Sequence, residues 1–493
     1  MSVKTEKYTP NFPEMQSVFT GRKNISAKEH IKRKIDNIRS QQLWEFRQLF
    51  SNWIPGDMLN SGNYFKSGRN RIYNLEIIFW AFLNQAFMQG TSCSEIVKKV
   101  QSWMLFKGRK QPSSNTSAYC QARKRLPLEL LKKVNHHIIK VLSSSNSGKS
   151  LWKSRVVKVV DGTGISMPDT PLNQKAYPQS SQMKAGCGFP QIKLTGVFSL
   201  ACGTMLGYAY GELDKAENVL WKKLWKLLKA NDIVLGDRGF CSYANIAALL
   251  QKKVDSVLRL HQAREKVLKG KSKDYVTTWK RPSTKPKNWS LSEWHSLPAE
   301  LKIRIIEAPL LRKGFRTQKV YICTTLLDAE KYPAQDIAEL YFKRWQIELF
   351  FRDIKTTMNM NVLRSKSPKM IKKELMMYSI AYNLLRGMML EAAEMYKVMV
   401  DRISFKATVQ QFNQWLWLFM SPGLTLKKLC ILKAKLYDKL VQKLIPERPG
   451  RNEPRAKKRR PKNYNLLTKP RHEMVIDCHR NRPERKNAFF ALT

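Results

Sequence analysis

The chain has 493 residues, of which 43% are hydrophobic, and its 89 Lys and Arg against 38 Asp and Glu give a formal net charge of +51. This hydrophobic content excludes a disordered polycation and is enough for several domains with a sizeable core. A folded protein with a strongly positive surface favours a polyanionic partner, with nucleic acid as the first candidate and an anionic membrane as the second.

Three features argue against a membrane or secreted protein. The long apolar stretch near residue 80, LEIIFWAFLNQAF, is too short to span a bilayer and contains Glu76, Asn84 and Gln85. The N-terminal MSVKTEKYTP has no apolar core, so no signal peptide is evident. Eight cysteines without a CxxC pair are typical of reduced thiols, so we expect a cytoplasmic protein.

Residues 1–142 are predicted to form a helical N-terminal region that binds DNA, with apolar periodicity from about residue 25. Within it, SCSEIVKKVQSW and SAYCQARKRLP could be two helices of a DNA-binding unit, although a structural helix pair explains them about as well. SSSNSGKS, residues 143–150, is predicted to be a linker.

The periodicity then changes to that of an α/β domain. KVVDGTGI is predicted as a strand ending in a turn, and KLTGVFSLACG with TMLGYAYGEL as a hairpin joined near Gly203. AENVLWKKLWKLLKA is predicted as a helix, DIVLGDRG as a short buried strand, SYANIAALLQKK as a helix and VDSVLRLH as a strand. This order indicates a mixed sheet and resembles the ribonuclease H-like fold, whose first three strands form an antiparallel meander.

Residues 151–261 therefore form the first part of a predicted core, and its second part, 319–400, begins with the strand KVYICTTLL. The segment between them, 262–318, is rich in Thr, Val, Ile and turn residues and is expected to be a β-rich insertion. Residues 401–444 continue as a C-terminal helical region. Residues 445–493 are rich in Pro and Arg and are predicted to be a basic, mostly disordered tail.

The segment YFKRWQIELFFRDIK, residues 341–355, mixes core-type and charged residues. Pro333 and the acidic Asp336 precede it and no glycine interrupts it, so a helix over 333–357 is predicted. At about 100° per residue, one narrow face of that helix, here called the stripe, holds Tyr341, Arg344, Glu348 and Lys355. Apolar residues fill most of the remaining circumference, and a thin polar stripe on a mostly buried helix suggests a cleft.

Three acidic residues fall where this architecture places reactive groups. Asp161 ends the first strand, Asp237 ends the fourth, and Glu348 lies on the stripe. Three carboxylates without nearby histidines favour Mg²⁺ or Mn²⁺ over zinc. Two such ions about 4 Å apart can activate a water or a 3′-hydroxyl and stabilise the leaving oxygen of a phosphodiester.

Each acidic residue also has an ordinary structural interpretation. Asp161 could cap a turn, and Asp237 could pair with Arg238 or cap the following helix. Arg344 and Glu348 are four residues apart and could be a helical ion pair. Their combination in a chain of charge +51 favours the active-site interpretation over these alternatives.

The stripe reproduces the Y-x2-R-x3-E-x6-K signature of transposases of the insertion sequence four family, which the chain resembles over most of residues 90 to 470. DGTG at 161 and DRGF at 237 match the other two acidic motifs of the family, and the similarity extends through MPDTPLNQ, YPQ, GFPQIKL, KEL and AYNLLR. The resemblance implies a DDE transposase with a ribonuclease H-like domain interrupted by a β-rich insertion. It also implies two Mg²⁺ or Mn²⁺ ions, held by the catalytic and metal-binding residues Asp161, Asp237 and Glu348.

The resemblance further implies that the rest of the stripe holds the phosphates of the cleaved DNA end. Arg344 suits bidentate phosphate contact, Lys355 supplies a point charge, and Tyr341 offers an aromatic surface with a hydroxyl donor. Arg352 points roughly the same way, and Arg259, in VLRLH, is a further candidate for a DNA contact. Both are therefore added to the predicted DNA-binding set.

Members of the family bind the terminal inverted repeats, nick the element end and let the freed 3′-hydroxyl attack the opposite strand to form a hairpin, which reopens before strand transfer. By this analogy the partners are double-stranded DNA and a second copy of the chain in the DNA-bound complex, with no membrane, at the bacterial nucleoid. Members also flip a base and stack it on a tryptophan of the insertion. The candidates are Trp279, Trp289 and Trp294, although burial in a core is the favoured interpretation of each.

Two other functions fit the same residues. One is a structure-specific DNA nuclease of the same fold, which would cut without joining. The other is a catalytically silent, domesticated DNA-binding protein. The intact acidic residues argue against the second, because sequence drift would be expected to spoil at least one of them.

Overall fold

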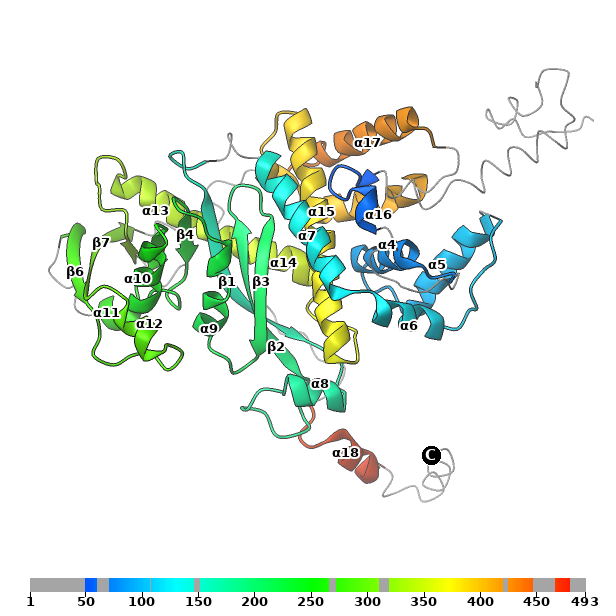
Figure 1. Cartoon of the computed structure of the whole chain (residues 1–493), viewed down its shortest axis with the longest axis horizontal. Coiled ribbons are helices and arrows are strands. Elements are labelled where there is room, and N and C mark those ends of the chain that lie inside the picture. The colour runs from blue at the N-terminus through cyan, green and yellow to red at the C-terminus, as the bar shows by residue number, and fades with distance from the viewer. Residues whose placement is uncertain are drawn as a thin grey trace, which may run out of the picture.

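The computed structural model describes residues 49–59, 71–106, 108–145, 151–265, 272–309, 319–419, 424–446 and 466–478. One mixed sheet lies at the centre (Figure 1). The helices that precede it in the sequence and those that follow it pack together beside it. Among these residues no helix has the length and apolar character needed to cross a membrane. The predicted α/β class is therefore confirmed, and the apolar stretch near residue 80 forms an ordinary buried helix.

The sheet has eight strands in the order β3-β2-β1-β4-β5-β8-β7-β6. Their bounds are β1 (Val157–Ser166), β2 (Gln191–Ser199), β3 (Met205–Glu212), β4 (Ile233–Gly236), β5 (Asp255–Arg259), β6 (Asp274–Lys280), β7 (Glu300–Pro309) and β8 (Lys319–Thr324). β1, β4 and β5 run parallel to one another, and every other neighbouring pair is antiparallel. The predicted hairpin of β2 and β3 is present, and it turns at Gly203, whose φ is +68°.

Short helices connect these strands. They are α8 (Pro171–Ala176), α9 (Glu217–Lys222), α10 (Tyr243–Gln251), α11 (Gln262–Glu265) and α12 (Leu291–His295). The helix predicted over AENVLWKKLWKLLKA was too long, because only α9 and a 3-10 turn at Trp225–Leu227 form. The chain turns early since the carboxylate of Asp232 accepts the Lys229 N–H at 2.6 Å and starts the return to β4.

The helices before the sheet follow a 3-10 turn at Gly56–Leu59 and are α4 (Leu75–Phe87), α5 (Cys93–Phe106), α6 (Ser117–Arg125) and α7 (Leu128–Ser145). The two helices predicted from SCSEIVKKVQSW and SAYCQARKRLP are confirmed as α5 and α6. α7 continues three residues into the predicted linker, whose remainder lies outside the described residues, as do residues 1–48.

The helical segments after the sheet begin with α13 (Ala334–Phe342), a 3-10 turn (Lys343–Trp345), α14 (Gln346–Arg352) and a π-helical turn (Asp353–Thr357). They continue as α15 (Pro368–Met395), a 3-10 turn (Val400–Arg402), α16 (Phe405–Phe419), α17 (Leu426–Val441) and α18 (Arg471–Cys478). α18 lies within the predicted tail, and Pro470 and first-turn Glu473 are helix-start signals. Residues 447–465 and 479–493 of that tail lie outside the described residues.

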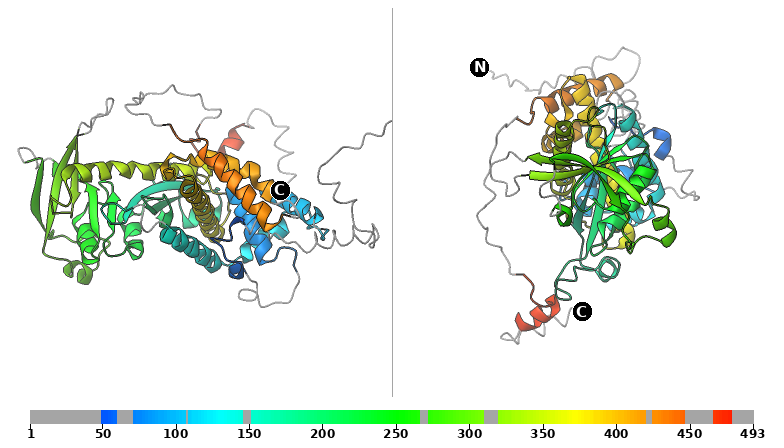
Figure 2. Two further views of the ribbon diagram at one scale, coloured as in Figure 1. Left: turned by 90° about the horizontal axis from the view of Figure 1, so that it is seen from above. Right: turned by 90° about the vertical axis from the view of Figure 1, so that its left-hand side faces the viewer.

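The sheet separates two hydrophobic layers. Val157 and Val159 of β1 face a layer shared with α4 to α7 and α13 to α17, whereas Val160 faces a layer shared with α9, α10 and α12. In Figure 1, α13 and α14 cross behind the sheet while α9, α10 and α12 lie in front of it, and Figure 2 shows the same two sides from above. Because strand residues alternate between faces, Asp161 belongs to the face of α14.

The buried side chain of Asn383, on α15, connects three elements. Its Nδ2 donates to the Met205 carbonyl of β3 at 3.1 Å, and its Oδ1 accepts the Met205 N–H at 2.9 Å. Nδ2 also donates to Oδ1 of Asn135, on α7, at 3.2 Å. One fully buried amide therefore joins the sheet to helices that precede and follow it.

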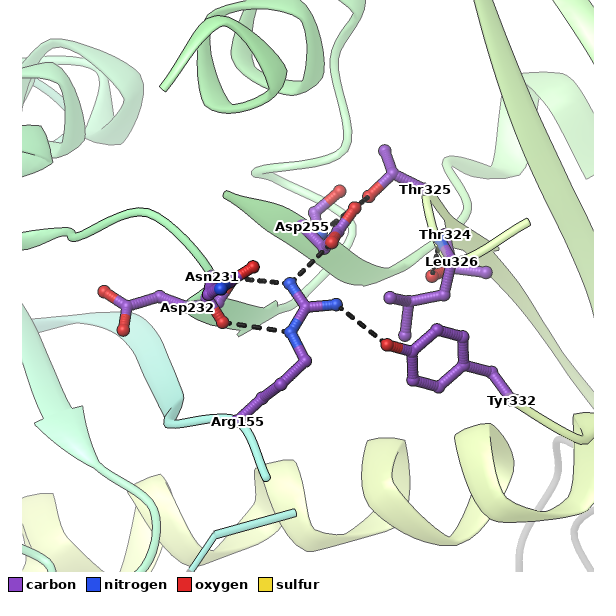
Figure 3. Close-up of polar contacts among 9 residues, drawn as sticks. Arg155, Asn231, Asp232, Asp255, Thr324, Thr325, Leu326 and Tyr332 are labelled. Carbon is purple, nitrogen blue, oxygen red and sulfur yellow. Dashed lines mark hydrogen bonds and ion pairs between the residues drawn. The ribbon is translucent and has the colours of Figure 1, made fainter. Parts of the chain in front are cut away.

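Arg155 lies at the amino ends of β4 and β5 (Figure 3). Its Nε donates to the Asn231 carbonyl at 3.0 Å, its Nη2 pairs with the Asp255 carboxylate at 2.5 Å, and its Nη1 donates to the Tyr332 hydroxyl at 3.3 Å. Tyr332 directly precedes α13. These bonds tie the amino ends of β4 and β5 to the start of the helix that carries the stripe.

The predicted insertion contributes β6, α12 and β7, and through β8 its strands continue the central sheet. Trp289 and Trp294 are buried in the core layer of this region. Trp279, on β6, is half-buried, and the Arg264 guanidinium lies 3.7 Å from the centre of its ring. The favoured interpretation of these tryptophans as core residues therefore fits Trp289 and Trp294.

Candidate active site

Asp161, on the central strand β1, lies beside Asp237, which directly follows the neighbouring strand β4. In the parallel pairing of β1 with β4, Val159 stands opposite Leu235, and continuing this register by two residues brings Asp161 level with Asp237. Neighbouring strands are about 5 Å apart, so the two carboxylates share one small region. The prediction that Asp161 ends the first strand at a turn was wrong, because β1 continues in register with β2 to Ser166 and Asp161 lies within it, where its Oδ1 accepts the N–H of the next residue at 2.8 Å. Asp237 does lie in a turn, where its Oδ1 accepts the Gly239 N–H at 2.8 Å.

Arg344 connects Asp161 with Glu348. Its Nη1 lies 3.7 Å from Asp161 Oδ2, and its Nη2 lies 3.7 Å from Glu348 Oε1. Arg344 is buried, with 8% of its surface exposed, and its Nε has no hydrogen-bond partner. The helical ion pair considered from the sequence is therefore present, but the same guanidinium also reaches the sheet. Glu348 itself is exposed and faces the site across Arg344.

The pKa of Asp161 reflects its burial and the carboxylates close to it. Burial, followed by the charges of Asp237 and Glu217, raises the pKa of Asp161 to about 6, against the opposing effects of its backbone hydrogen bond and Arg344. A cation that reached both aspartates would relieve this cost.

Lys355 approaches the same strand from the π-helical turn. Its Nζ donates to Oγ1 of Thr163 at 2.7 Å, and Thr163 lies two residues after Asp161 on the same face of β1. Burial lowers the pKa of Lys355. The stripe residues Arg344 and Lys355 therefore contact β1 at positions that belong to the acidic site.

The other predicted DNA-contact residues are placed differently from one another. Tyr341 is buried beneath Arg344, whose guanidinium lies 5.9 Å from the ring centre, and burial raises the pKa of its phenol. Arg259 ends β5, one strand beyond β4, and its buried Nε has no hydrogen-bond partner. Arg352 is exposed at the end of α14.

The stripe helix differs from the regular, mostly buried helix that was predicted. A 3-10 turn and a π-helical turn interrupt it, and Trp345 and Leu349 are each 46% exposed. The exposure follows from packing, since only one side of α14 rests on the sheet layer.

A buried ion pair anchors the π-helical turn. Arg386 Nη2 lies 3.1 Å from Asp353 Oδ2, and its Nε donates to the Tyr382 hydroxyl at 3.0 Å. Tyr382 in turn donates to the Gly203 carbonyl at 2.7 Å. Burial raises the pKa of Asp353 to about 6, and the Arg386 charge opposes this. This network connects the turn that carries Lys355 to α15 and to the β2–β3 turn.

Sequence reasoning missed Glu217, the first residue of α9. Its carboxylate lies against Gly162, the residue after Asp161, and burial together with the charge of Asp237 raises its pKa. No spacing signal points to it, because it reaches the site by packing of a short helix on the other face of the sheet.

The donor chemistry of the site fits a hard divalent cation. The acidic side chains offer carboxylate oxygens, which Mg²⁺ and Mn²⁺ prefer, and the Glu217 carboxylate occupies the space that a Cβ at Gly162 would fill beside Asp161. In the described part of the chain, no three or more His, Cys, Asp or Glu side chains stand close enough to form a ready-made metal cage. The site is therefore an open arrangement around two adjacent aspartates.

Comparison with known proteins places these residues in context. Residues 152–384, which include Asp161, Asp237 and Glu348, match the family model for a transposase DDE domain. The chain is 27% identical over 406 residues to the transposase InsG for insertion sequence element IS4 of Escherichia coli (strain K12), which spans 80% of this chain and 88% of that protein.

Two further similarities are more limited. The chain is 34% identical over 88 residues to the transposase for insertion sequence element IS421 of Escherichia coli, covering 16% of this chain and 24% of that protein. Among solved structures, the piggyBac transposase synaptic complex with hairpin DNA aligns with a TM-score of 0.41 and 12% identity, over 83% of this chain and 87% of that chain.

Proposed function

Residues 152–384 carry a transposase DDE domain, and from this premise we propose that the chain binds the terminal inverted repeats of its insertion sequence, cleaves the DNA and transfers the freed ends to a target. The observation that carries the proposal is the pairing of Asp161 with Asp237 at one sheet edge, with Arg344 reaching from Asp161 to Glu348. The proposed activity belongs in the cytoplasm, where the nucleoid is.

The strand order supports a ribonuclease H-like core. β3-β2-β1-β4-β5, with an antiparallel first hairpin and parallel β1, β4 and β5, is the arrangement expected of that fold. β6 and β7 then correspond to the β-rich insertion. In this core, Asp161, Asp237 and Glu348 are the proposed catalytic and metal-binding residues.

Asp161, Asp237 and Glu348 would hold two Mg²⁺ or Mn²⁺ ions, which supply charge stabilisation for the attacking and leaving oxygens of a phosphodiester. Arg344 and Lys355 would hold the phosphates of the DNA end beside that site. Arg344 presents a planar donor fork with an unused Nε, and Lys355 presents a point charge on Thr163.

Three further residues complete the proposed DNA contacts. Arg259 adds a partly buried cation at the end of β5, and Tyr341 supports the guanidinium of Arg344 from below. Arg352 is exposed and free to meet the DNA backbone outside the site. Formation and reopening of hairpin ends is proposed from the family resemblance alone.

Substitution of the acidic residues tests the proposal. Asp161→Asn, Asp237→Asn and Glu348→Gln should each abolish nicking of end DNA in Mg²⁺ and leave end binding in Ca²⁺ largely intact, because each removes a metal ligand and no phosphate contact. Gel assays of labelled end DNA measure both properties. If Glu348→Gln nicks at the wild-type rate, the assignment is wrong.

The same assay separates the alternative functions. A structure-specific nuclease would release nicked product without ever joining it to target DNA. A catalytically silent DNA-binding protein would bind the ends and leave them uncut in Mg²⁺ and in Mn²⁺.

A further inference from the structure

The carboxylate of Glu217 enters the acidic site from the face of the sheet opposite Glu348. α9 packs in the same layer as Val160, whereas α14 packs in the layer of Val159. The acidic edge of the sheet therefore has a carboxylate on each side of it, in addition to the two aspartates on the strands.

The two oxygens of Glu217 face two different parts of the site. A Cβ added at Gly162 would lie 2.1 Å from Oε1, which shows that this oxygen occupies the space directly beside β1. A Cβ added at Gly239 would lie 3.8 Å from Oε2 and 3.1 Å from Asp237 Oδ1. Glu217 thus spans from the residue after Asp161 to the turn that carries Asp237.

This position is electrostatically unfavourable without a cation. No hydrogen bond or ion pair joins the Glu217 carboxylate to another described residue. Glu217 Oε1 lies against the residue after Asp161 and Oε2 lies beside the turn that carries Asp237, so the carboxylate stands close to two others. Carboxylates held together without compensation are expected where a cation binds.

A second observation at the same site points to a bound ligand. Arg344 is more than nine-tenths buried and faces Asp161 and Glu348, but both carboxylates are 3.7 Å away and its Nε has no partner. A buried guanidinium with unused donor capacity is costly unless a ligand completes its hydrogen bonds. An anion beside the carboxylates, such as a phosphate, can lie there only if cations balance the acidic charge.

We propose that Glu217 is a fourth carboxylate of the divalent-cation site, acting on the cation held by Asp161 and Asp237 from the α9 side. This inference rests on the proposed function, because it requires that a divalent cation binds between those aspartates. It enlarges the acidic set beyond the three residues found from the sequence and makes the β3–α9 connection part of the site.

Binding of Mn²⁺ to the full-length protein in the absence of DNA tests the proposal without using activity. Electron paramagnetic resonance of free Mn²⁺ gives the affinity of each variant. Glu217→Gln removes the charge with little change of shape and should weaken Mn²⁺ binding by about tenfold or more. Glu212→Gln, an exposed carboxylate at the end of β3, is the matched control and should leave the affinity unchanged.

A second variant leaves Glu217 unchanged and tests the position of its carboxylate. Gly162→Ala should displace Glu217 Oε1 and weaken Mn²⁺ binding in the same direction, and it preserves the backbone N–H that Asp161 accepts. It also serves if Glu217→Gln fails to fold. In the metal-free state, Glu217→Gln should melt at the wild-type temperature or above it, because a repelling charge has been removed.

Asp161→Asn separates failure of this inference from failure of the proposed function. If Asp161→Asn loses Mn²⁺ and Glu217→Gln binds it as the wild type does, the cation site stands and the role of Glu217 is overturned. If neither substitution changes Mn²⁺ binding, the cation site between the aspartates is itself wrong, and the inference fails with it.

Discussion

Asp161 is the residue at which protonation would compete with the proposed cation binding. Its pKa of about 6 in the folded protein exceeds the ordinary value of 3.8, so the metal-free folded state takes up this proton more readily than the unfolded state. The group therefore favours folding as the pH falls through about 6, and this contribution is lost as the pH rises. A bound cation has the opposite preference, since it favours the ionised carboxylate.

We expect Mg²⁺ to raise the melting temperature at about pH 7 and to lose this effect at about pH 5, because protonated Asp161 is a poor ligand. Thermal unfolding with and without Mg²⁺ at several pH values measures the difference. Asp161→Asn should abolish the effect at every pH, whereas substitution of exposed Asp169 should preserve it. An equal effect of Mg²⁺ at both pH values in the wild type would contradict the expectation.

Arg344 and Lys355 are the residues that distinguish a DNA-holding stripe from a solvated face. As solvated charges, their replacement by Ala would change stability by under about 0.5 kcal/mol and leave the chemistry intact. If the two side chains contact phosphates, each replacement by Ala removes charge-assisted hydrogen bonds worth roughly 1.5–3 kcal/mol. We expect weaker complexes with cleaved ends and a shallower salt dependence, because fewer counterions are released.

A time course on labelled end DNA at two salt concentrations resolves nicked, hairpin and joined product. The first nick should suffer less than hairpin formation and strand transfer, since these later steps depend on holding a freed end. Lys343→Ala, an exposed neighbour outside the stripe, should behave as the wild type. Equal slowing of every step with an unchanged salt slope would indicate a folding defect instead.

At the residue scale, the sequence predicted what strand pairing determines and missed what packing determines. Asp237 could be found because it follows the end of β4, and Asp161 because parallel pairing of β1 with β4 brings it level with Asp237, although β1 continues to Ser166 instead of ending at Asp161 as predicted. Glu217 could not, because its approach depends on where a six-residue helix lands on the sheet. That Arg344 reaches Asp161 as well as Glu348 is likewise a tertiary fact that helical spacing does not contain.

At the scale of elements, the stripe helix shows how a regular-pitch prediction can succeed on an irregular helix. The 3-10 turn at Lys343–Trp345 is wound more tightly than an α-helix, and the π-helical turn at Asp353–Thr357 less tightly. The two departures have opposite sign, so they partly cancel over the length of the segment. Arg344 and Lys355 therefore still approach β1, although neither irregular turn could be predicted.

The Asp353–Arg386 pair should hold the π-helical turn in place. Asp353→Ala leaves a buried guanidinium without its carboxylate and should cost about 3–5 kcal/mol of unfolding free energy, because both side chains are at most 9% exposed. Chemical unfolding of Asp353→Ala, Arg386→Met and the double variant measures the coupling between them. The double variant should be more stable than the sum of the single losses predicts.

If Asp353→Ala lowered only the free energy of unfolding, the proposed connection between the Asp353–Arg386 pair and Lys355 would not be supported. The connection predicts that Asp353→Ala, assayed where it remains folded, also resembles Lys355→Ala in its salt dependence of end binding. If Asp353→Ala costs less than about 1 kcal/mol, the pair is not what anchors the turn.

At the scale of the whole molecule, the net charge of +51 opposes self-association of the free protein. We expect a monomer alone and a dimer on paired DNA ends, because DNA neutralises the charge that keeps two copies apart. Sizing by light scattering with and without end DNA at moderate salt checks this. A stable dimer without DNA would count against it.

The order of strands and helices could be read from hydrophobic periodicity along most of the described chain, whereas two larger features could not. The inserted strands β6 and β7 continue the central sheet, a pairing that local pattern does not specify. α18 forms in a segment whose Pro and Arg content indicated disorder. For β6 and β7, composition describes the segment but not the strands with which it pairs.

The amide of Asn383 bears on how such a protein can diversify. Binding modules joined to an enzyme by a linker alone can be exchanged between relatives, since nothing else needs to match. Here the buried Asn383 side chain on α15 forms hydrogen bonds with both α7 and the sheet. A foreign N-terminal region must therefore also supply the acceptor oxygen that Asn135 provides. We therefore expect recombination between relatives to carry α7 and α15 together. If the proposed function holds, recognition of new DNA ends would arise by substitution on surfaces away from this junction.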